Sequence, residues 1–246
     1  MKVLFITSTR IGDAILSTSV LRYIKNKFPY SSLYIATGKT PASLFKNFGN
    51  IKKIFILKKK KFKIHWLELW WQTFFNKWDI IIDLRGSLIS YLLFNEQKYI
   101  YKSIKENIHR LDELALLMRT KYLPLPSIPI LKKDIKKISK DFLKLKNPIA
   151  IGASANWPAK IWPAKKFVKL IKILLKEKKF GKEKFIVFFG SSKDLKNIKK
   201  ITKHLKKSRV INFCGKLNLI EVLAHLKKCK IFIGNDSGLM HIASVS

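Results

Sequence analysis

Four junctions in the sequence join a short apolar run to a cluster of small and polar residues. These junctions hold the side chains that could do chemistry. The first is "TSTRIGDAI", which follows the run at 2–6, and the last is "GNDSGLMHI", which follows the run at 231–233. In open parallel α/β sheets, ligands bind just outside the carboxyl ends of the strands. We therefore take the four junctions as candidate binding and catalytic sites.

The first junction offers a candidate base. Asp13 lies in the first turn of a helix that the apolar spacing predicts from Ile11 to Phe28, and Pro29 ends this helix. A carboxylate that faces a cleft can take a proton from a substrate hydroxyl. A carboxylate in the first turn can also simply complement the helix dipole and cap free N–H groups. The residues alone leave both roles open.

Two further junctions have features of an anion or nucleotide site. In "GASANWPAKIWPAKKF", a turn with Ser154 precedes Lys160, whose charge would lie beside backbone N–H groups at a helix start. In "FFGSSKDL", Gly190 lets a ligand approach the backbone closely. Asp194 either accepts a hydrogen bond from a ribose hydroxyl or caps the next helix, and both alternatives stay open.

The last junction combines the most polar groups. Gly234 ends the apolar run, and Asp236 or Ser237 is expected to cap the helix that follows. Gly238 permits close backbone approach, and His241 lies one turn into the helix. Free amides at a helix start attract anions, so this junction is typical of a diphosphate site.

Composition bounds the class of protein. The chain has 246 residues, of which 48% are hydrophobic, so it can bury a core and is not expected to be disordered. Lys and Arg number 51 against 15 Asp and Glu, a net charge of +36 that suits nucleic acid, a membrane surface or a phosphorylated substrate. The excess is nearly all lysine and is scattered, which favours general lysine enrichment over a specific nucleic-acid footprint.

Targeting and metal signals are weak. Cys214 and Cys229 are in no metal-ligand spacing, and we expect two reduced thiols and no metal site. The apolar run at the N-terminus is too short for a signal peptide, and no window has the length of a membrane span. These features predict a cytoplasmic protein, with a contact to the inner face of the inner membrane as an open alternative.

Apolar runs alternate with helix-like segments along the whole chain, which predicts doubly wound α/β sheets. The expected strands are residues 2–6, 32–37, 51–57, 79–86, 98–102, 148–154, 184–190, 210–215 and 230–234. The expected helices are residues 11–28, 41–48, 88–94, 108–118, 132–145, 162–177, 194–205 and 218–229.

A proline-rich stretch, "TKYLPLPSIPIL", interrupts this alternation before it restarts. We therefore expect an N-terminal Rossmann-like domain at 1–125, a linker and connecting helix at 126–146, and a C-terminal Rossmann-like domain at 147–246.

An aromatic segment, "KKKKFKIHWLELWWQTFFNKW" (58–78), has no obvious chemistry. Its large side chains form two stripes at helical spacing: Phe62, Trp66, Trp70, Phe74 and Trp78 in one, and Leu67, Trp71 and Phe75 in the other. Such stripes usually pack into a core. The alternative is a helix lying in the plane of a membrane, with the lysines leading into it.

The segments "RIGDAILSTSVLR", "ASANWPAKIWPAKKF" and "CGKLNLIEVLAHLKKCKIFIGNDSGLMHIAS", in this order, resemble glycosyltransferase family 9, the ADP-heptose:lipopolysaccharide heptosyltransferases. The resemblance runs from the first strand to the last residue. The runs "GNDSGLMH" and "KIWP" are its most specific parts, and "IIDLRGSL" fits the family more loosely.

The resemblance implies a GT-B fold, in which two Rossmann-like domains face each other across a cleft. The N-terminal domain would bind the acceptor and the C-terminal domain an ADP-sugar, a co-substrate, with no cofactor. Transfer would invert the anomeric centre without a metal. Asp13 would be the catalytic base, and Lys160 would hold the donor phosphates. The remaining candidate donor-binding residues are Ser154, Gly190, Asp194, Asp236, Ser237, Gly238 and His241.

The resemblance also implies the partners: an ADP-heptose-like nucleotide sugar and a lipid-linked lipopolysaccharide core acceptor. Family members continue past the last junction, so we expect the second domain to be incomplete and the sheet edge beside its last strand to be exposed. Two rival functions stay open: a basic nucleic-acid-binding protein, and a donor-binding remnant without catalysis.

Overall fold

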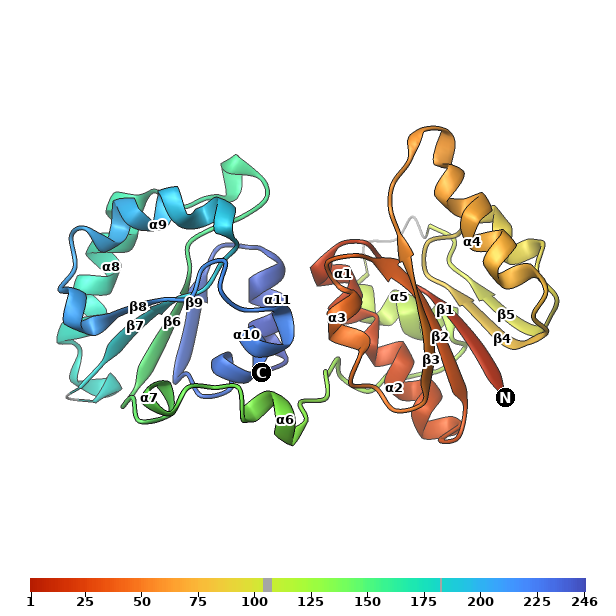
Figure 1. Ribbon diagram of the computed structural model, residues 1–246, viewed down its shortest axis with the longest axis horizontal. Coiled ribbons are helices and arrows are strands. Elements are labelled where there is room, and N and C mark those ends of the chain that lie inside the picture. Colours follow the sequence, from red (N-terminus) through yellow and green to blue (C-terminus); the bar gives the residue numbers. More distant parts are fainter. Residues whose placement is uncertain (104–107, 182) are drawn as a thin grey trace. The chain divides into compact units, whose positions relative to one another are not determined.

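The computed structural model describes residues 1–103, 108–181 and 183–246, which form two compact α/β units, Met1–Pro129 and Ile130–Ser246 (Figure 1). The division between them falls inside the segment expected as a linker, 126–146. Most of that segment belongs to the second unit, because α6 (Lys132–Ile135) packs against α10 (Leu219–Leu226). The single helix expected at 132–145 is wrong, since α6 and α7 (Lys140–Leu143) are two separate turns of helix.

The first unit is built on a five-stranded parallel sheet in the order β3-β2-β1-β4-β5. The chain therefore adds β2 and β3 on one side of β1 and then β4 and β5 on the other side. The strands are β1 (Lys2–Ile6), β2 (Ser32–Gly38), β3 (Ile51–Leu57), β4 (Trp78–Asp83) and β5 (Asn95–Ile100). The helices are α1 (Ile11–Leu16), α2 (Thr18–Lys27), α3 (Ala42–Phe45), α4 (Ile64–Phe74) and α5 (Arg110–Leu117).

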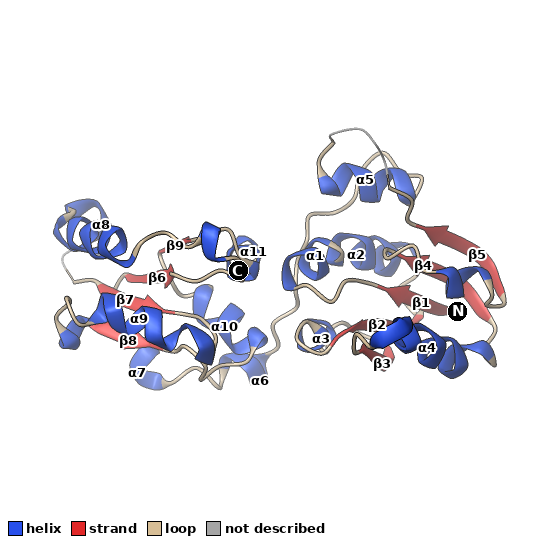
Figure 2. Cartoon of the chain, turned by 90° about the horizontal axis from the view of Figure 1, so that it is seen from above, coloured by secondary structure: helices blue, strands red, loops and turns tan. Residues whose placement is uncertain are grey.

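Alternate residues of β1 supply two separate cores, because successive side chains of a strand point to opposite faces. Val3 and Phe5 pack in one cluster with residues of α2 and α5. Leu4 and Ile6 pack in the other cluster with Leu69 of α4. Figure 2 shows these helices on opposite faces of the sheet. Every position of β1 after Lys2 is thus buried, as the continuous apolar run predicts for a parallel sheet.

The helix expected from 11 to 28 is one helical path with a break at Ser17. The hydroxyl of Ser17 donates to the carbonyl of Ala14 at 2.7 Å, and that of Thr18 donates to the carbonyl of Ile15 at 2.6 Å. Such hydrogen bonds to the preceding turn compete with the helix ladder and bend helices. The break separates α1, which carries Asp13, from the buried part of α2.

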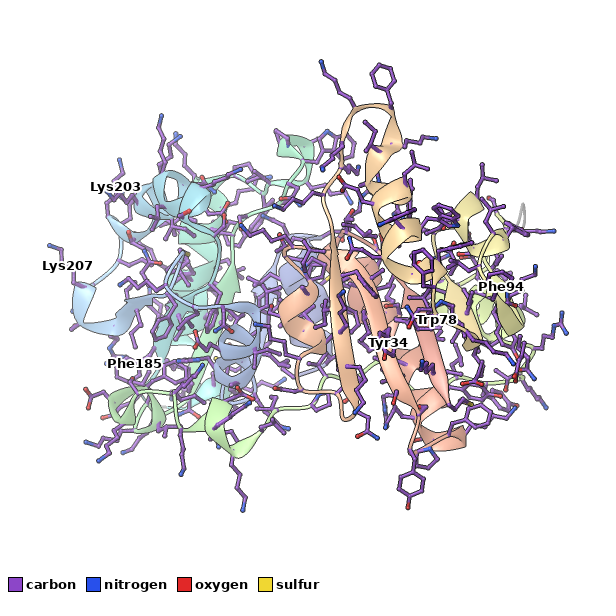
Figure 3. The ribbon with its side chains drawn as sticks, turned by 45° about the vertical axis from the view of Figure 1, so that its right-hand side comes forward. Tyr34, Trp78, Phe94, Phe185, Lys203 and Lys207 are labelled. Atoms are coloured by element: carbon purple, nitrogen blue, oxygen red, sulfur yellow. The ribbon has the colours of Figure 1, made fainter. Side chains whose placement is uncertain are left out.

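The aromatic segment divides its two stripes between the core and the surface. Trp66, Trp70 and Phe74 pack against the cluster around Leu69, which confirms the core role for these three members of the first stripe. Phe62 of the same stripe lies before α4 and is 92% exposed, so the core role is wrong for it. Leu67, Trp71 and Phe75 are exposed. Trp78 does not belong to the helix, because it begins β4 and packs edge to face on Tyr34 with ring centroids 5.0 Å apart (Figure 3).

The second unit repeats the strand order of the first in a four-stranded parallel sheet, β8-β7-β6-β9. Its central strand β6 pairs with β7 on one side and β9 on the other. The strands are β6 (Pro148–Gly152), β7 (Phe185–Phe188), β8 (Val210–Asn212) and β9 (Ile231–Gly234). The helices besides α6, α7 and α10 are α8 (Ala164–Lys176), α9 (Leu195–Thr202) and α11 (Gly238–Ser244).

Helices α8 and α9 cover one face of this sheet through Phe167, Ile171 and Ile198. The other face holds an aromatic group in which Phe213 stacks on Phe189 and also contacts His225, with ring centroids 5.8 Å and 4.9 Å apart. Strand β9 is an edge strand of the described sheet and is only partly buried.

The two cysteines are free thiols, as expected. Burial raises the pKa of both Cys214 and Cys229 to about 12, so neither is a ready nucleophile at neutral pH. None of the helices in the described part of the chain has the length and apolar character that a bilayer crossing requires.

Helix α4 offers a direct test of its orientation, because two leucines on it have opposite environments. Leu69 is 2% exposed and Leu67 is 63% exposed. We expect Leu69→Ala to destabilise the first unit by about 2–5 kcal/mol through lost burial and a cavity. Leu67→Ala should change its stability by less than about 0.5 kcal/mol. Urea denaturation followed by far-UV circular dichroism measures both; equal effects would contradict this orientation.

Candidate functional site

Asp13 lies beside a cavity of about 300 Å³ at the carboxyl ends of β1, β4 and β5. This is the place where the strand order reverses, and ligands bind at such switch points in open α/β sheets. The residues lining the cavity are Thr7, Ser8, Asp13, Ser17, Leu84, Arg85, Tyr101, Arg110 and Leu114. Three strand ends and helices α1 and α5 thus contribute to one site.

The Asp13 carboxylate is held by a side chain rather than used as a helix cap. Ser8 Oγ donates to Asp13 Oδ2 at 3.1 Å and accepts from the backbone N–H of Arg10 at 3.1 Å. Arg10 is the N-cap residue of α1, and its side chain makes no capping hydrogen bond. Asp13 is an exposed residue, so its carboxylate can be reached by a molecule in the cavity. The geometry permits the role of a base.

A buried aspartate shapes the neighbouring turn. Asp83, at the end of β4, is fully buried and accepts hydrogen bonds from the backbone N–H of Arg85 at 2.8 Å and of Ser87 at 2.7 Å. The hydroxyls of Ser87 and Ser90 donate to the same carboxylate. Because its hydrogen bonds fix the turn, Asp83 sets the position from which Arg85 enters the cavity lining.

A second arginine of the cavity is braced from two sides. The Arg110 guanidinium lies over the Tyr101 ring, 4.4 Å from its centroid, and donates to Glu113. Burial alone would lower the pKa of Arg110, but its hydrogen bonds to Glu113 and Tyr101 raise it, so the group stays charged. A braced, charged guanidinium suits a carboxylate or phosphate on a bound molecule.

The second candidate site lies where β6 and β9 end side by side. Gly152 pairs with Gly234 in register, and the backbone N–H of Asn235 donates to the Gly152 carbonyl at 3.0 Å. A Cβ atom on Gly234 would lie 2.8 Å from that carbonyl and 2.7 Å from the Phe232 ring. Both values are closer than a carbon atom tolerates, so this junction has no room for a side chain.

Lys160 and Asp236 meet at this junction from opposite segments. Lys160 ends a 3₁₀ turn (Pro158–Lys160) after β6, and its ammonium group forms an ion pair with Asp236, which follows β9. The hydrogen bond and charge of Lys160 lower the pKa of Asp236, with a smaller contribution from His241. Asp236 therefore stays ionised to a more acidic pH than an ordinary aspartate. Of the two residues expected to cap the last helix, Asp236 or Ser237, it is Ser237 that occupies the N-cap position, although its side chain makes no capping hydrogen bond.

Two buried polar atoms at this junction lack partners. Asn235 is only 7% exposed, and its Oδ1 accepts from the backbone N–H of Trp162 at 3.2 Å. Its amide Nδ2 and the Ser237 Oγ make no hydrogen bond with any described residue. Buried polar groups without partners are rare, and each calls for an explanation such as a missing ligand. Asn235 thus links the segment after the Lys160 turn to the loop that follows β9, residues 235–237, which we call the β9 loop, and it presents a free donor.

The remaining candidates differ in their surroundings. Ser154 is partly exposed just beyond β6, and Gly238 begins α11, with His241 one turn later. Asp194 is engaged locally, because its Oδ2 accepts from the backbone N–H of Ser191 at 2.7 Å and from the Ser191 hydroxyl at 2.8 Å. Asp194 is the N-cap residue of α9 by position, but its side chain makes no capping hydrogen bond to that helix and instead closes the capping box of the preceding 3₁₀ turn, Ser192–Asp194.

Gly190 packs tightly on the same group. A Cβ atom there would lie 3.0 Å from Asp194 Oδ2 and 3.2 Å from Cys214 Sγ. Local packing therefore accounts for this glycine without a ligand. The donor-binding roles of Gly190 and Asp194 stay predictions.

Sequence reasoning missed four residues of these sites: Arg85, Tyr101, Arg110 and Asn235. One signal was available for the arginines, because this chain has only six and uses lysine for almost all its other cations. Arg85 and Arg110 are two of these six, and arginine is the cation suited to planar, bidentate recognition of phosphate or carboxylate. Asn235 was part of the last junction, but nothing in the sequence indicates its link to Trp162.

Comparisons with known proteins decide the family. The model of "Glycosyltransferase family 9 (heptosyltransferase)" matches residues 114–245, more than half of the chain. The chain belongs to this family. The matched residues include Lys160 and the whole β9 loop, whereas Asp13 lies outside them. Family membership makes the protein a glycosyltransferase and an enzyme, as the sequence predicted.

Relatives cover the rest of the chain. Lipooligosaccharide heptosyltransferase 2 of Campylobacter jejuni is 28% identical over all of this chain and 78% of its own length. The structure of Escherichia coli ADP-heptose lps heptosyltransferase II has a TM-score of 0.75 at 19% identity, covering 100% of this chain and 82% of that one. A family 9 glycosyltransferase from Veillonella parvula has a TM-score of 0.80 at 19% identity, covering 98% and 77%.

These similarities confirm the predicted fold class, a GT-B type α/β fold with two Rossmann-like units. That the units face each other across a cleft stays a prediction.

The crowded junction of β6 and β9 predicts a sharp effect of one methyl group. Gly234→Ala should displace Phe232 or the Gly152 carbonyl, which accepts the Asn235 N–H, and destabilise the second unit by about 1–3 kcal/mol. Gly49→Ala is the matched control, because a Cβ atom there meets nothing within 4 Å. Thermal denaturation of both variants measures the difference; an unchanged midpoint for Gly234→Ala would contradict the packing.

Proposed function

We propose that this enzyme transfers a heptose, or a similar sugar, from an ADP-sugar to the core of a lipopolysaccharide or lipooligosaccharide. The family description and the names of the relatives, which include ADP-heptose and lipooligosaccharide, support this choice. The observation that carries the proposal is the convergence of Lys160, Asn235 and Ser237 at the ends of β6 and β9. A cation and two unpartnered polar groups there suit a diphosphate.

The donor half of the reaction rests on charge. When the bond between the sugar and the diphosphate breaks, negative charge grows on the departing ADP. Lys160 forms an ion pair with Asp236 of the β9 loop. We propose that, when the donor binds, the Lys160 ammonium group donates hydrogen bonds to the diphosphate as well as to Asp236. The Asn235 amide then donates to a phosphate oxygen, which stabilises the charge as it develops.

The acceptor half rests on the cavity beside Asp13. In the proposal, Asp13 takes the proton from the acceptor hydroxyl as that oxygen attacks the anomeric carbon. Ser8 holds the carboxylate in place through its 3.1 Å hydrogen bond. Attack from the side opposite the leaving diphosphate inverts the configuration. Arg85 and Arg110 are proposed to bind phosphate or carboxylate groups of the acceptor core, which direct its hydroxyl toward Asp13.

We further propose that Lys160 and the β9 loop supply the positive charge that other transferases take from a metal ion. The described residues contain no group of three or more His, Cys, Asp or Glu that could hold a metal. Unchanged turnover in the presence of a chelator tests this part. The proposal also keeps the expected site of action, the cytoplasmic side of the inner membrane.

Removing the base should separate chemistry from donor binding. We expect Asp13→Asn to lower turnover by about 10²- to 10⁴-fold, the usual contribution of a general base. ADP affinity should not change, because Asp13 is not part of the β6 and β9 junction. Transfer to purified core acceptor and calorimetric titration with ADP measure the two quantities. Full activity of the variant would remove Asp13 from the mechanism.

Removing the charge of Lys160 should weaken donor binding. Lys160→Met removes a charged hydrogen bond to the diphosphate, and we expect ADP affinity to fall by about 10- to 100-fold. Lys169→Met, an exposed lysine on α8, is the matched control and should bind ADP normally. The same affinity for ADP in both variants would show that the diphosphate binds elsewhere.

The wild-type protein distinguishes the rival functions. Binding of ADP together with transfer supports the proposal. ADP binding without transfer to any core acceptor would identify a donor-binding remnant. Tight, salt-dependent binding of DNA or RNA without ADP binding would favour the nucleic-acid hypothesis.

A further inference from the structure

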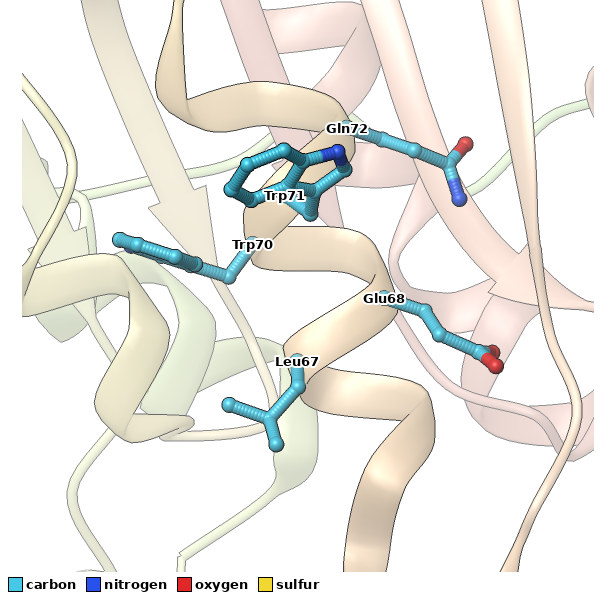
Figure 4. Close-up of a pocket in the computed structure, with 5 residues that line it drawn as sticks. All are labelled: Leu67, Glu68, Trp70, Trp71 and Gln72. Carbon is cyan, nitrogen blue, oxygen red and sulfur yellow. The ribbon is translucent and has the colours of Figure 1, made fainter.

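The exposed side of α4 presents an apolar surface that the catalytic proposal does not use. Leu67, Trp71 and Phe75, spaced four residues apart, are 63%, 65% and 77% exposed. Figure 4 shows Leu67, Trp70 and Trp71 on one side of the helix and Glu68 and Gln72 on the other. Exposed apolar side chains that lie next to one another mark interaction sites, whereas single ones are ordinary surface.

Ring contacts extend this surface beyond the helix. Trp71 contacts Phe75, Phe75 contacts Phe74, and Phe74 contacts Phe94, the residue before β5, with ring centroids 5.3–5.7 Å apart. Phe94 is 64% exposed, and the short helix before it, η2 (Leu88–Tyr91), packs against α4. Leu88 and Leu92 are exposed there too. We call Leu67, Trp71, Phe75, Leu88, Leu92 and Phe94 the apolar surface.

A cluster of lysines leads directly into this surface. Lys58, Lys59, Lys60, Lys61 and Lys63 precede α4, and all five are exposed. Lys60 pairs with Glu68; within the described residues, the other four lysines form no ion pair. Phe62, between them, is almost fully exposed. Cations beside large apolar side chains match the two layers of a membrane surface, anionic headgroups above acyl chains.

The same helix also carries a hollow beside these rings. Leu67, Glu68, Trp70, Trp71 and Gln72 line this hollow, which has a volume of about 410 Å³. Trp70 packs into the core cluster around Leu69, so the exposed indole beside the hollow is that of Trp71. Tryptophan is favoured at membrane interfaces, where its ring is apolar and its N–H donates to lipid oxygen atoms.

We propose that α4, its lysine lead-in and the apolar surface dock the first unit onto an anionic lipid bilayer. The lysines bind headgroup phosphates, while Trp71, Phe75 and Phe94 insert among the upper parts of the acyl chains. The core face of α4 stays packed on the sheet, so docking needs no unfolding. The inference concerns a surface separate from the Asp13 cavity and the β9 loop, and lipid binding can be measured without sugar transfer.

Co-sedimentation of the whole protein with vesicles tests the proposal. The probe is phosphatidylglycerol mixed with phosphatidylcholine, and phosphatidylcholine alone is the reference. We expect clear preference for the anionic vesicles, weakened by high salt because salt screens surface charge. Brominated lipids should quench tryptophan fluorescence, and Trp71→Phe should remove much of that quenching. Binding without quenching would mean that the aromatic rings stay outside the bilayer and would overturn the proposal.

Two variants with matched controls make the test specific. Changing Lys58, Lys59, Lys60, Lys61 and Lys63 to Gln should weaken binding to anionic vesicles by about tenfold or more, given the contribution of each lysine near such a surface. The control changes five exposed lysines of the second unit to Gln: Lys199, Lys200, Lys203, Lys206 and Lys207. Figure 3 shows Lys203 and Lys207 projecting outward. Equal losses in both variants would reveal adsorption through general charge and overturn the proposal.

The second variant removes the rings and keeps the charge. Trp71→Ala with Phe75→Ala should weaken vesicle binding by about tenfold, because insertion of both rings is lost. Its control is Tyr30→Ala with Tyr122→Ala, two other exposed aromatics. Both side chains of the test pair are exposed, so the fold should persist, and circular dichroism checks this. Unchanged binding, or a lipid-free dimer that becomes monomeric, would overturn membrane docking, the latter in favour of self-association.

Discussion

The parallel pairing of β6 with β9 is the interaction on which the donor side of the enzyme depends. It places Gly152 opposite Gly234 and lets the Gly152 carbonyl accept the Asn235 N–H at 3.0 Å. This hydrogen bond starts the polar loop at a fixed position beside the segment that carries Lys160. Without side chains at the two glycines, the strands end close together, and the residues that follow each strand meet. A site built this way owes its geometry to the sheet.

The same physical rule produces the site in the first unit. In both sheets the first four strands have the spatial order third, second, first, fourth. The order in which strands are added therefore reverses between the first strand and the fourth. Polar residues following the first and fourth strands then lie next to each other: Ser8 and Asp13 with Arg85 in one unit, Lys160 with Asp236 in the other. The Asp83 carboxylate plays the supporting role in the first unit that the Gly152 carbonyl plays in the second.

Much of this could be predicted from the sequence, because the strand runs are continuous and apolar and each is followed by a polar turn. The places of Asp13 and Lys160 follow from that pattern alone. Contacts between distant segments could not be predicted: Arg110 reaches the Asp13 cavity only because α5 packs on the sheet. The helical spacing of aromatic residues continued through Trp78, although the chain had already turned into β4. For Asp194 the sequence left two roles open. The structure shows that its carboxylate accepts two hydrogen bonds from Ser191, three residues earlier in the chain.

A crystal structure of the whole protein with bound ADP tests the central claim most directly. The account predicts the diphosphate at the ends of β6 and β9, with Lys160 Nζ and either Asn235 Nδ2 or Ser237 Oγ within about 3 Å of its oxygen atoms. An ADP molecule whose phosphates lie away from this junction, with Lys160 still engaged only by Asp236, would contradict it.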